Sequence, residues 1–200
     1  KKSYTMQMPV LKNVTVLGKS TIIVKSDSGN LYNVPVGHIK KYENGDIVDV
    51  INEKGSWMGS GFINDHSKIR VRLISRNTND RFDEAFWRRR IRYALDYRQT
   101  VMEDDFRCCR LIFGEADMFP GLTVDFFENV LVCEILSLGI ERIRELIFKL
   151  LCEELADMGY PVKYICERNE SELRIKEGMD KRKGYVCVPG YTSEPNEGQT

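Results

Sequence analysis

The feature that most constrains the fold is an acidic loop between two apolar runs near the middle of the chain. The loop, GEADMFPGLTVD (residues 114–125), begins after the apolar run 110–113 and overlaps the apolar run 122–127. Short apolar runs separated by Pro-Gly turn chemistry predict a strand, a shaped loop and a second strand. Asp125 falls inside the second run, where a buried carboxylate without a partner would be costly. We therefore expect the carboxylates of this segment to be structural and paired.

An arginine on the preceding helix is the expected partner. Apolar residues recur at helical spacing between residues 83 and 104, which predicts a helix of about twenty residues. Arg98 falls in the middle of its apolar stripe, and an arginine in that position requires a carboxylate. The candidates are Glu115, Asp117 and Asp125. The hypothesis is that Arg98 ties the helix to the acidic loop.

The rest of the chain divides into two regions of different pattern. Before residue 77, six short β-like runs, including one at 31–36, are separated by turn signals, which is typical of a small β-barrel. After residue 81, strands at 107–113, 122–127 and 130–136 precede a long helix at 140–158, a strand at 162–166, a short helix at 171–176 and a strand at 185–188. The fold prediction is α+β. The predicted units are a β-barrel domain at 1–76, an α+β central domain at 82–190 and a linker at 191–200.

Net charge is zero overall, but the charges are segregated along the chain. Residues 1–98 carry a net charge of +8 and residues 99–200 a net charge of −8. A basic half suggests an anionic partner, most commonly nucleic acid. The alternating strand 68–76 and the following helix supply six candidate phosphate contacts: Lys68, Arg70, Arg72, Arg88, Arg89 and Arg92. A solvated charged face without a binding function remains the alternative.

Several functional classes find no support in the residues. The six cysteines are scattered without a Cys-x-x-Cys pair and only two histidines are present, so we expect reduced thiols, no metal and a cytoplasmic location. The glycines at 55, 59 and 61 lie inside a strand-like run, which predicts bulges or close packing rather than a phosphate loop. Apolar runs of about 20 residues, the length that spans a bilayer, are lacking. The residues taken alone predict a binding region without a chemical centre.

Four segments together resemble one enzyme family. The segment from Gly45-Asp46 to Arg72 resembles the end of the PUA domain in bacterial 23S rRNA cytosine-C5 methyltransferases, and the acidic loop resembles the signature of that family's central domain. The motif SLGIE (137–141) and the segment from Glu167 to Met179 continue the pattern. The likeness covers about residues 45–190. Residues 36–41, VGHIKK, depart from the family's usual His-Pro-Trp segment.

The resemblance implies a role that this chain does not complete alone. In that family the PUA and central domains precede a Rossmann-like domain, which binds S-adenosylmethionine and carries the catalytic cysteine. That domain is expected beyond this chain, so the resemblance implies rRNA as partner, no metal, and no catalytic or cofactor-binding residue here. The alternatives are a stand-alone RNA-binding module or adaptor, and an interaction protein unrelated to RNA. The sequence leaves the target nucleotide and the oligomeric state open. A homodimer is compatible with it.

Overall fold

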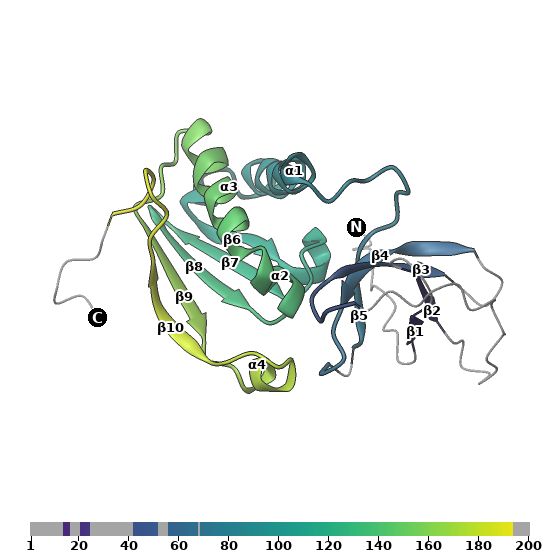
Figure 1. The fold of residues 1–200 in the computed structure, drawn as a ribbon. Helices are drawn as coiled ribbons and strands as arrows, with labels where there is room; N and C mark the ends of the chain where they lie inside the picture. The colour runs from purple at the N-terminus through teal and green to yellow at the C-terminus, as the bar shows by residue number, and fades with distance from the viewer. Residues whose placement is uncertain (1–13, 17–20, 25–41, 52–55, 68, 194–200) are drawn as a thin grey trace.

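The computed structural model describes residues 14–16, 21–24, 42–51, 56–67 and 69–193 and contains two five-stranded sheets (Figure 1). The predicted strand at 31–36, the candidate Lys68 and the last seven residues of the predicted linker lie outside the described residues.

The first sheet has the order β1-β2-β3-β4-β5. Its strands are Val14–Val16, Thr21–Val24, Ile47–Ile51, Trp57–Ile63 and Val71–Ser75. Neighbouring strands pair antiparallel, except for the parallel pair β2–β3. The last three strands match the predicted runs with ends shifted by a few residues.

The glycines of β4 distort this sheet. The register shifts between Ser60 and Gly61 where β4 meets β5. A side chain at Gly61 would collide with the backbone of Arg72, and Gly59 has a φ of +149°. Only a residue without a Cβ fits this close approach of two strands. The predicted bulge and close packing are confirmed.

The second sheet has the order β10-β9-β8-β7-β6 and carries helices on one face (Figure 1). Its strands in chain order are Cys108–Phe113, Leu122–Phe127, Val130–Ile135, Tyr164–Asn169 and Arg182–Val186. Helix α1 (Glu84–Met102) precedes β6, and helices α2 (Leu138–Arg142) and α3 (Arg144–Asp157) join the parallel strands β8 and β9. Short 3₁₀ segments η1 (Glu103–Arg107) and η2 (Gly114–Asp117) flank β6, and α4 (Glu172–Lys176) follows β9. The α+β fold class is confirmed.

Two predicted elements differ from the structure. The helix expected at 140–158 is two helices, because Ile143 (φ −111°, ψ 11°) leaves the helical conformation between α2 and α3. Ile140 and Ile147 both face the core on either side of the break, so the apolar spacing continues and conceals it. The last strand begins at Arg182 and not at Tyr185. Charged residues and a glycine at its start do not form a β-like pattern in the sequence, but an edge strand tolerates them.

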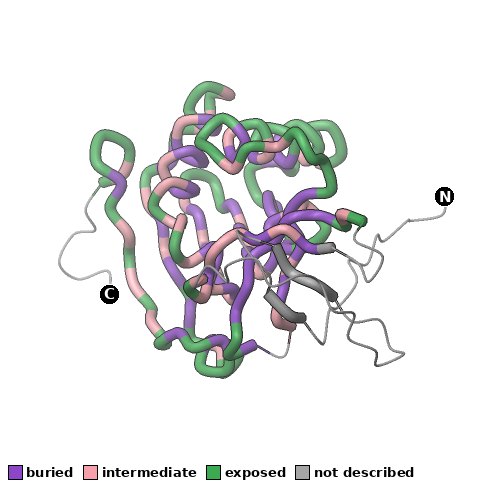
Figure 2. Tube along the Cα trace, turned by 45° about the vertical axis from the view of Figure 1, so that its right-hand side comes forward, coloured by how far each residue is buried: buried purple, intermediate pink, exposed green. Residues whose placement is uncertain are grey.

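The two sheets share one core. Phe62 of β4 and Ile74 of β5 belong to the same buried cluster as the residues beneath α1, and Phe62 stacks on Trp87 with ring centroids 6.1 Å apart. Ile63 and Leu73, their neighbours on the same strands, point the other way into a smaller cluster of the first sheet. Most positions of β4 and β5 are accordingly buried, on both sides of the sheet, and Figure 2 colours buried positions purple. The first sheet therefore contributes to the core of the second sheet and its helices.

Candidate nucleic-acid interface

The start of α1 places the candidate arginines. Asp83 caps the helix by accepting a hydrogen bond from the Phe86 amide, 2.9 Å away, and Glu84 lies in the first turn. Phe86 and Trp87 are buried, so the helix has its orientation fixed from its first turn. The following arginines, 88 to 90, therefore leave the helix in three different directions.

Arg88 and Arg92 face α3 and are ion-paired there. Arg88 bonds to Glu84, Glu153 and Glu154 at 2.7, 2.6 and 3.0 Å, and Arg92 also pairs with Glu154. The hydrogen bond with Glu84, followed by that with Glu153, raises the pKa of Arg88 further above its ordinary value. The Glu154 side chain is only 1% exposed. These two arginines compensate a buried carboxylate and join α1 to α3.

Arg89 points to solvent beside the segment that links the two sheets. Its guanidinium is 3.2 Å from Asp80 and 5.7 Å from the centroid of the Phe86 ring. The side chain remains 48% exposed. Of the three helix candidates, Arg89 has the fewest carboxylate contacts.

The two described candidates near β5 lie on the first sheet. Arg70 pairs with Asp65 and donates to the Tyr42 hydroxyl. Arg72 lies 3.2 Å from Glu115 of the acidic loop and 2.9 Å from Glu177, and its side chain is 16% exposed. Arg72 therefore connects the first sheet to two separate segments of the central domain.

Glu177 is the centre of that connection, and sequence reasoning gave it no role of its own. Besides Arg72, it accepts hydrogen bonds from Ser67 Oγ at 2.5 Å and Asn64 Nδ2 at 3.1 Å. The residue is buried. A carboxylate that receives three donors at the contact between two sheets fixes their relative orientation. In the sequence, Glu177 is distinguished only by its place in the resembling segment 167–179.

The acidic loop distributes its carboxylates over different arginines. Asp117 accepts from Arg98 Nη2 at 2.6 Å and from the Phe113 amide at 2.7 Å. Both side chains of the Arg98–Asp117 pair are about one-tenth exposed, at 11% and 12%. Arg98 thus forms an ion pair with Asp117 of the loop, while Glu115 of the same loop forms an ion pair with Arg72.

Asp125 has a separate partner within the sheet. It receives two hydrogen bonds from Arg110, at 2.7 and 3.0 Å. This two-point geometry is the strong form of the arginine–carboxylate contact. Asp125 therefore pairs with Arg110 of β6 and not with Arg98 of α1.

Arg90 is a site residue that sequence reasoning missed. Its Nη1 donates to the carbonyls of Ile74 and Met118, the second at 2.9 Å, and its guanidinium lies 4.4 Å from the centre of the Phe86 ring. Burial lowers the pKa of Arg90 to about 10, which leaves it charged at neutral pH. Its spacing of three residues from Trp87 and four from Ala94 put it on the apolar stripe, and that signal could have identified it.

These elements enclose a cavity of about 550 Å³ between the inter-sheet linker, α1 and η2. Its lining residues are Asn77, Asp80, Phe86, Arg89, Arg90, Tyr93, Ala94, Ala116, Asp117 and Met118. Tyr93 is 65% exposed. Arg76 and Arg81, next in sequence to two of the lining residues, are exposed and form no ion pair with any described residue. Sequence reasoning treated that linker only as a domain boundary.

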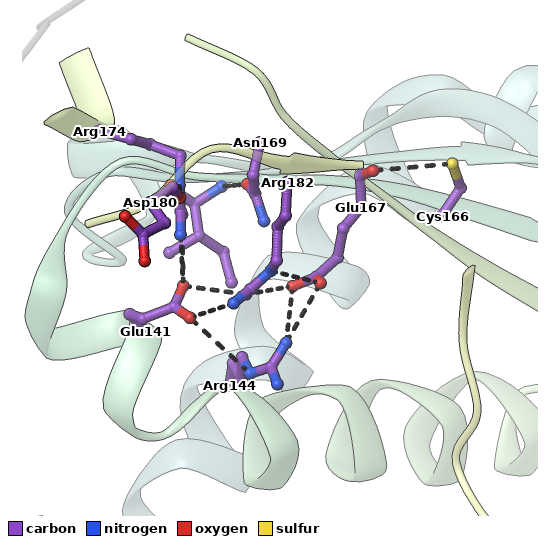
Figure 3. A network of polar contacts seen from close by, with 9 residues as sticks. Glu141, Arg144, Cys166, Glu167, Asn169, Arg174, Asp180 and Arg182 are labelled. Atoms are coloured by element: carbon purple, nitrogen blue, oxygen red, sulfur yellow. Dashed lines mark hydrogen bonds and ion pairs between the residues drawn. The ribbon is translucent and has the colours of Figure 1, made fainter. Parts of the chain in front are cut away.

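A second cluster of charges lies under the end of the central sheet (Figure 3). Glu167 accepts from Arg144 at 3.1 Å and from Arg182 at 2.7 Å, and Glu141 accepts from Arg182 and Arg174. Arg174 is 1% exposed and also donates to the carbonyls of Ile135 and Asp180. Every charged group of this cluster has a partner of opposite charge, so the cluster is structural.

The described residues do not fit S-adenosylmethionine. Their parallel strand–helix–strand unit runs from β8 through α2 to β9, and the cofactor would approach the start of α2. A Cβ at Gly139 there would collide with the Phe62 ring, so the first sheet already fills this space.

The cysteines and possible metal ligands add no chemical centre in the described ranges. Burial raises the pKa of Cys152 to about 12 and that of Cys133 well above its ordinary value, which disfavours the reactive thiolate. Cys108 is exposed and Cys109 buried, as strand alternation predicts. Among residues with described positions, no group of three or more metal-ligand side chains gathers. The helices in the described part are too short or too polar to cross a bilayer.

Comparison with known proteins gives a consistent set of relatives. Residues 27–76 match a PUA-like domain. Over 71% of its length the chain is 34% identical to Ribosomal RNA large subunit methyltransferase I of Alteromonas mediterranea and 37% identical to the same protein of Pseudoalteromonas translucida. Over 78% it is 34% identical to that of Aliivibrio fischeri. The matched regions are 35% to 38% of those proteins, so the chain spans little more than a third of their length.

Solved structures agree on the fold. A protein from Streptococcus mutans assigned as a SAM-dependent methyltransferase superimposes with a TM-score of 0.60 at 14% identity, over 79% of this chain and 38% of that one. A second structure assigned as a methyltransferase, complexed with SAH, gives a TM-score of 0.60 at 15% identity, over 78% of this chain and 36% of that one.

Proposed function

We propose that this chain supplies the RNA-binding and central domains of an S-adenosylmethionine-dependent methyltransferase that acts on cytosine C5 of large-subunit rRNA in the cytoplasm. The observation that carries the proposal is the 34–37% identity, over 71% of the chain, to proteins named Ribosomal RNA large subunit methyltransferase I. The PUA-like match in the basic half supports RNA as the partner. The proposed domain limits are 1–76 and 82–190.

The chemistry is proposed to belong to a region outside this chain. The relatives are nearly three times as long as the matched part, and the start of α2 is filled by Phe62. That other region would bind S-adenosylmethionine and would carry the catalytic nucleophile. The residues present here hold the RNA and fix the orientation of the first sheet on the central domain.

The proposed RNA contacts are the six cations chosen from the sequence, and the geometry ranks them. Arg89 keeps 48% of its side chain exposed and can exchange its carboxylate partner for a phosphate at low cost. Arg92 is 45% exposed but ranks lower, because its partner Glu154 is buried. Arg70 and Arg88 are about one-third exposed, at 33% and 35%. Arg72 is the least exposed and has two carboxylate partners, which favours a role in holding the two sheets together. Lys68 keeps its proposed role without a described position.

The test is binding of this chain to labelled fragments of large-subunit rRNA at two salt concentrations. Affinity should fall steeply between about 50 and about 200 mM salt, because neutralised phosphates release counterions. Arg89→Ala should reduce the slope of log affinity against log salt by about 1. Absence of binding at low salt contradicts the RNA-binding role of this chain.

A stand-alone RNA-binding adaptor is the second candidate, favoured by the filled space at Gly139. Transfer of labelled methyl groups from S-adenosylmethionine to rRNA separates the two. The enzyme proposal requires activity from the chain extended by the following reading frame, whereas an adaptor shows none in any extension.

A further inference from the structure

We propose that the cavity between the inter-sheet linker, α1 and η2 holds one base of single-stranded RNA, with Tyr93 as the stacking surface. This inference rests on the proposed function and assigns a particular ligand group to one site on the RNA-binding surface.

The cavity has the size and wall chemistry that a nucleobase requires. Its volume of about 550 Å³ lies within the range of small-ligand sites, and one wall is the exposed Tyr93 ring. A large aromatic side chain that is 65% exposed on an arginine-rich helix gains most from a partner that covers its face. Unpaired RNA bases are commonly bound by stacking on such rings.

Fixed polar groups face the same space. Arg90 is held in place by the Ile74 and Met118 carbonyls, so its charge is already positioned before any ligand binds. The exposed Asn77 lines the cavity; its Nδ2 has a long contact of 3.4 Å to Asp80, and its Oδ1 accepts from the Asn79 amide at 3.1 Å. An amide of this kind can both donate to and accept from the edge of a base. These groups would read the base that Tyr93 covers.

The charge around the cavity suits a polyanion. The two lining carboxylates are already engaged, Asp80 by Arg89 and Ser75, and Asp117 by Arg98. The neighbouring Arg76 and Arg81 are exposed and without a described ion pair. Backbone phosphates on either side of the bound base would therefore meet arginines that need not give up a carboxylate first.

Tyr97 provides a matched control on the same helix. It is 58% exposed and one turn further along α1, but it does not line the cavity. Its ring instead lies 4.9 Å from the Arg98 guanidinium. A general loss of exposed aromatic surface on α1 would affect both residues, whereas a base-binding cavity depends on Tyr93 alone.

The experiment measures fluorescence anisotropy of a short fluorescein-labelled single-stranded RNA with the full chain. Tyr93→Ala should weaken binding about tenfold without changing the salt slope, since stacking and not charge is lost. Tyr97→Ala should stay within about twofold of the wild type. Tyr93→Trp should retain binding, while Tyr93→Leu, which keeps bulk but no ring, should weaken it like alanine.

The outcomes distinguish failure of the base site from failure of the RNA-binding role. If the wild type binds in a salt-dependent manner but Tyr93→Ala and Tyr97→Ala behave alike, the cavity is not a base site and the RNA-binding role stands. Equal retention by Tyr93→Leu and Tyr93→Trp overturns stacking in the same way. Failure of the wild type to bind RNA overturns both the proposed function and this inference. Thermal unfolding of each variant identifies any loss of binding that comes from unfolding.

Discussion

Two arginine-rich regions of this molecule differ in how their charges are compensated. Under the end of the central sheet, Arg144, Arg174 and Arg182 share Glu141 and Glu167, and Arg174 is 1% exposed. At the junction of the two sheets, Arg76, Arg81 and Arg89 are exposed; Arg89 lines the cavity, and it alone of the three has a described ion pair. Buried arginines with full sets of acceptors stabilise the fold, while exposed ones remain able to bind an anion. Composition counts these arginines equally, but their surroundings give them different roles.

The largest effect is expected from Arg174→Ala. The substitution leaves Glu141 with one partner fewer and the carbonyls of Ile135 and Asp180 without their donor. Loss of one member of a buried ion pair costs about 3–5 kcal/mol. Urea denaturation should show that loss in the free energy of unfolding. Arg168→Ala, at an exposed position of β9, is the control and should change it by less than about 0.5 kcal/mol.

A smaller effect is expected at the contact between the sheets. Glu177→Gln keeps the shape but removes the charge that accepts from Arg72 and Ser67. Loss of charge-assisted hydrogen bonds should cost about 1–3 kcal/mol. Limited proteolysis should then cut the linker near residue 77 sooner than in the wild type. Unchanged cleavage together with unchanged unfolding would show that Glu177 does not hold the sheets together.

The third-largest effect is expected from acid, which should lower the free energy of unfolding by protonating ion-paired carboxylates. Burial acts to raise the pKa of Glu153, but hydrogen bonds from Arg88 and Tyr191 outweigh it and hold that pKa below its ordinary value of 4.5. A carboxyl group whose pKa is lower in the folded state contributes stability above its unfolded pKa and loses it as pH falls through the folded value. The stability that Glu153 contributes should therefore be complete above its ordinary pKa of 4.5 and decrease as the pH falls below that value.

The variant Glu153→Gln identifies the source of that acid sensitivity. It should reduce the loss of stability between neutral and acidic pH, as measured by thermal unfolding across a pH series. Asp65, whose pKa is also lowered, would account for part of what remains. An identical pH profile in the variant would show that Glu153 contributes nothing to it.

The smallest stability effect is expected at the junction. Arg76→Ala combined with Arg81→Ala should change the free energy of unfolding by less than about 0.5 kcal/mol, because both side chains are exposed. The same double variant should reduce the slope of log RNA affinity against log salt by about 2. A large loss of stability here would place these arginines in the same class as Arg174.

The sequence predicted what depends on local pattern. Apolar periodicity located α1 and β7 closely, turn chemistry located the acidic loop, and glycine spacing located the bulge at Gly61. Each of these follows from residues near one another in the chain, so a single sequence contains the information.

Long-range pairing was harder to obtain from the sequence. Arg72 and Glu177 are 105 positions apart, and nothing near either residue indicates the other. Arg88 and Arg92 are predicted phosphate contacts opposite the apolar stripe of their helix, because helical periodicity does not show that Glu154 of α3 lies there. The cavity around Tyr93 is formed by three segments that are separate in the sequence, so it could not be predicted from local pattern either.

The contact between Phe62 and Gly139 has a consequence for the order of events during synthesis. Phe62 stacks on Trp87 and also lies against Gly139 of α2, 77 positions later in the chain, so its burial is completed only after α2 is made. At translation rates of about 5–20 residues per second, that delay is on the order of ten seconds. During that interval the finished first sheet presents an apolar side to the surrounding medium. A nascent chain that stalls between these two residues should therefore be a preferred client of chaperones, whereas one that stalls after α3 should not.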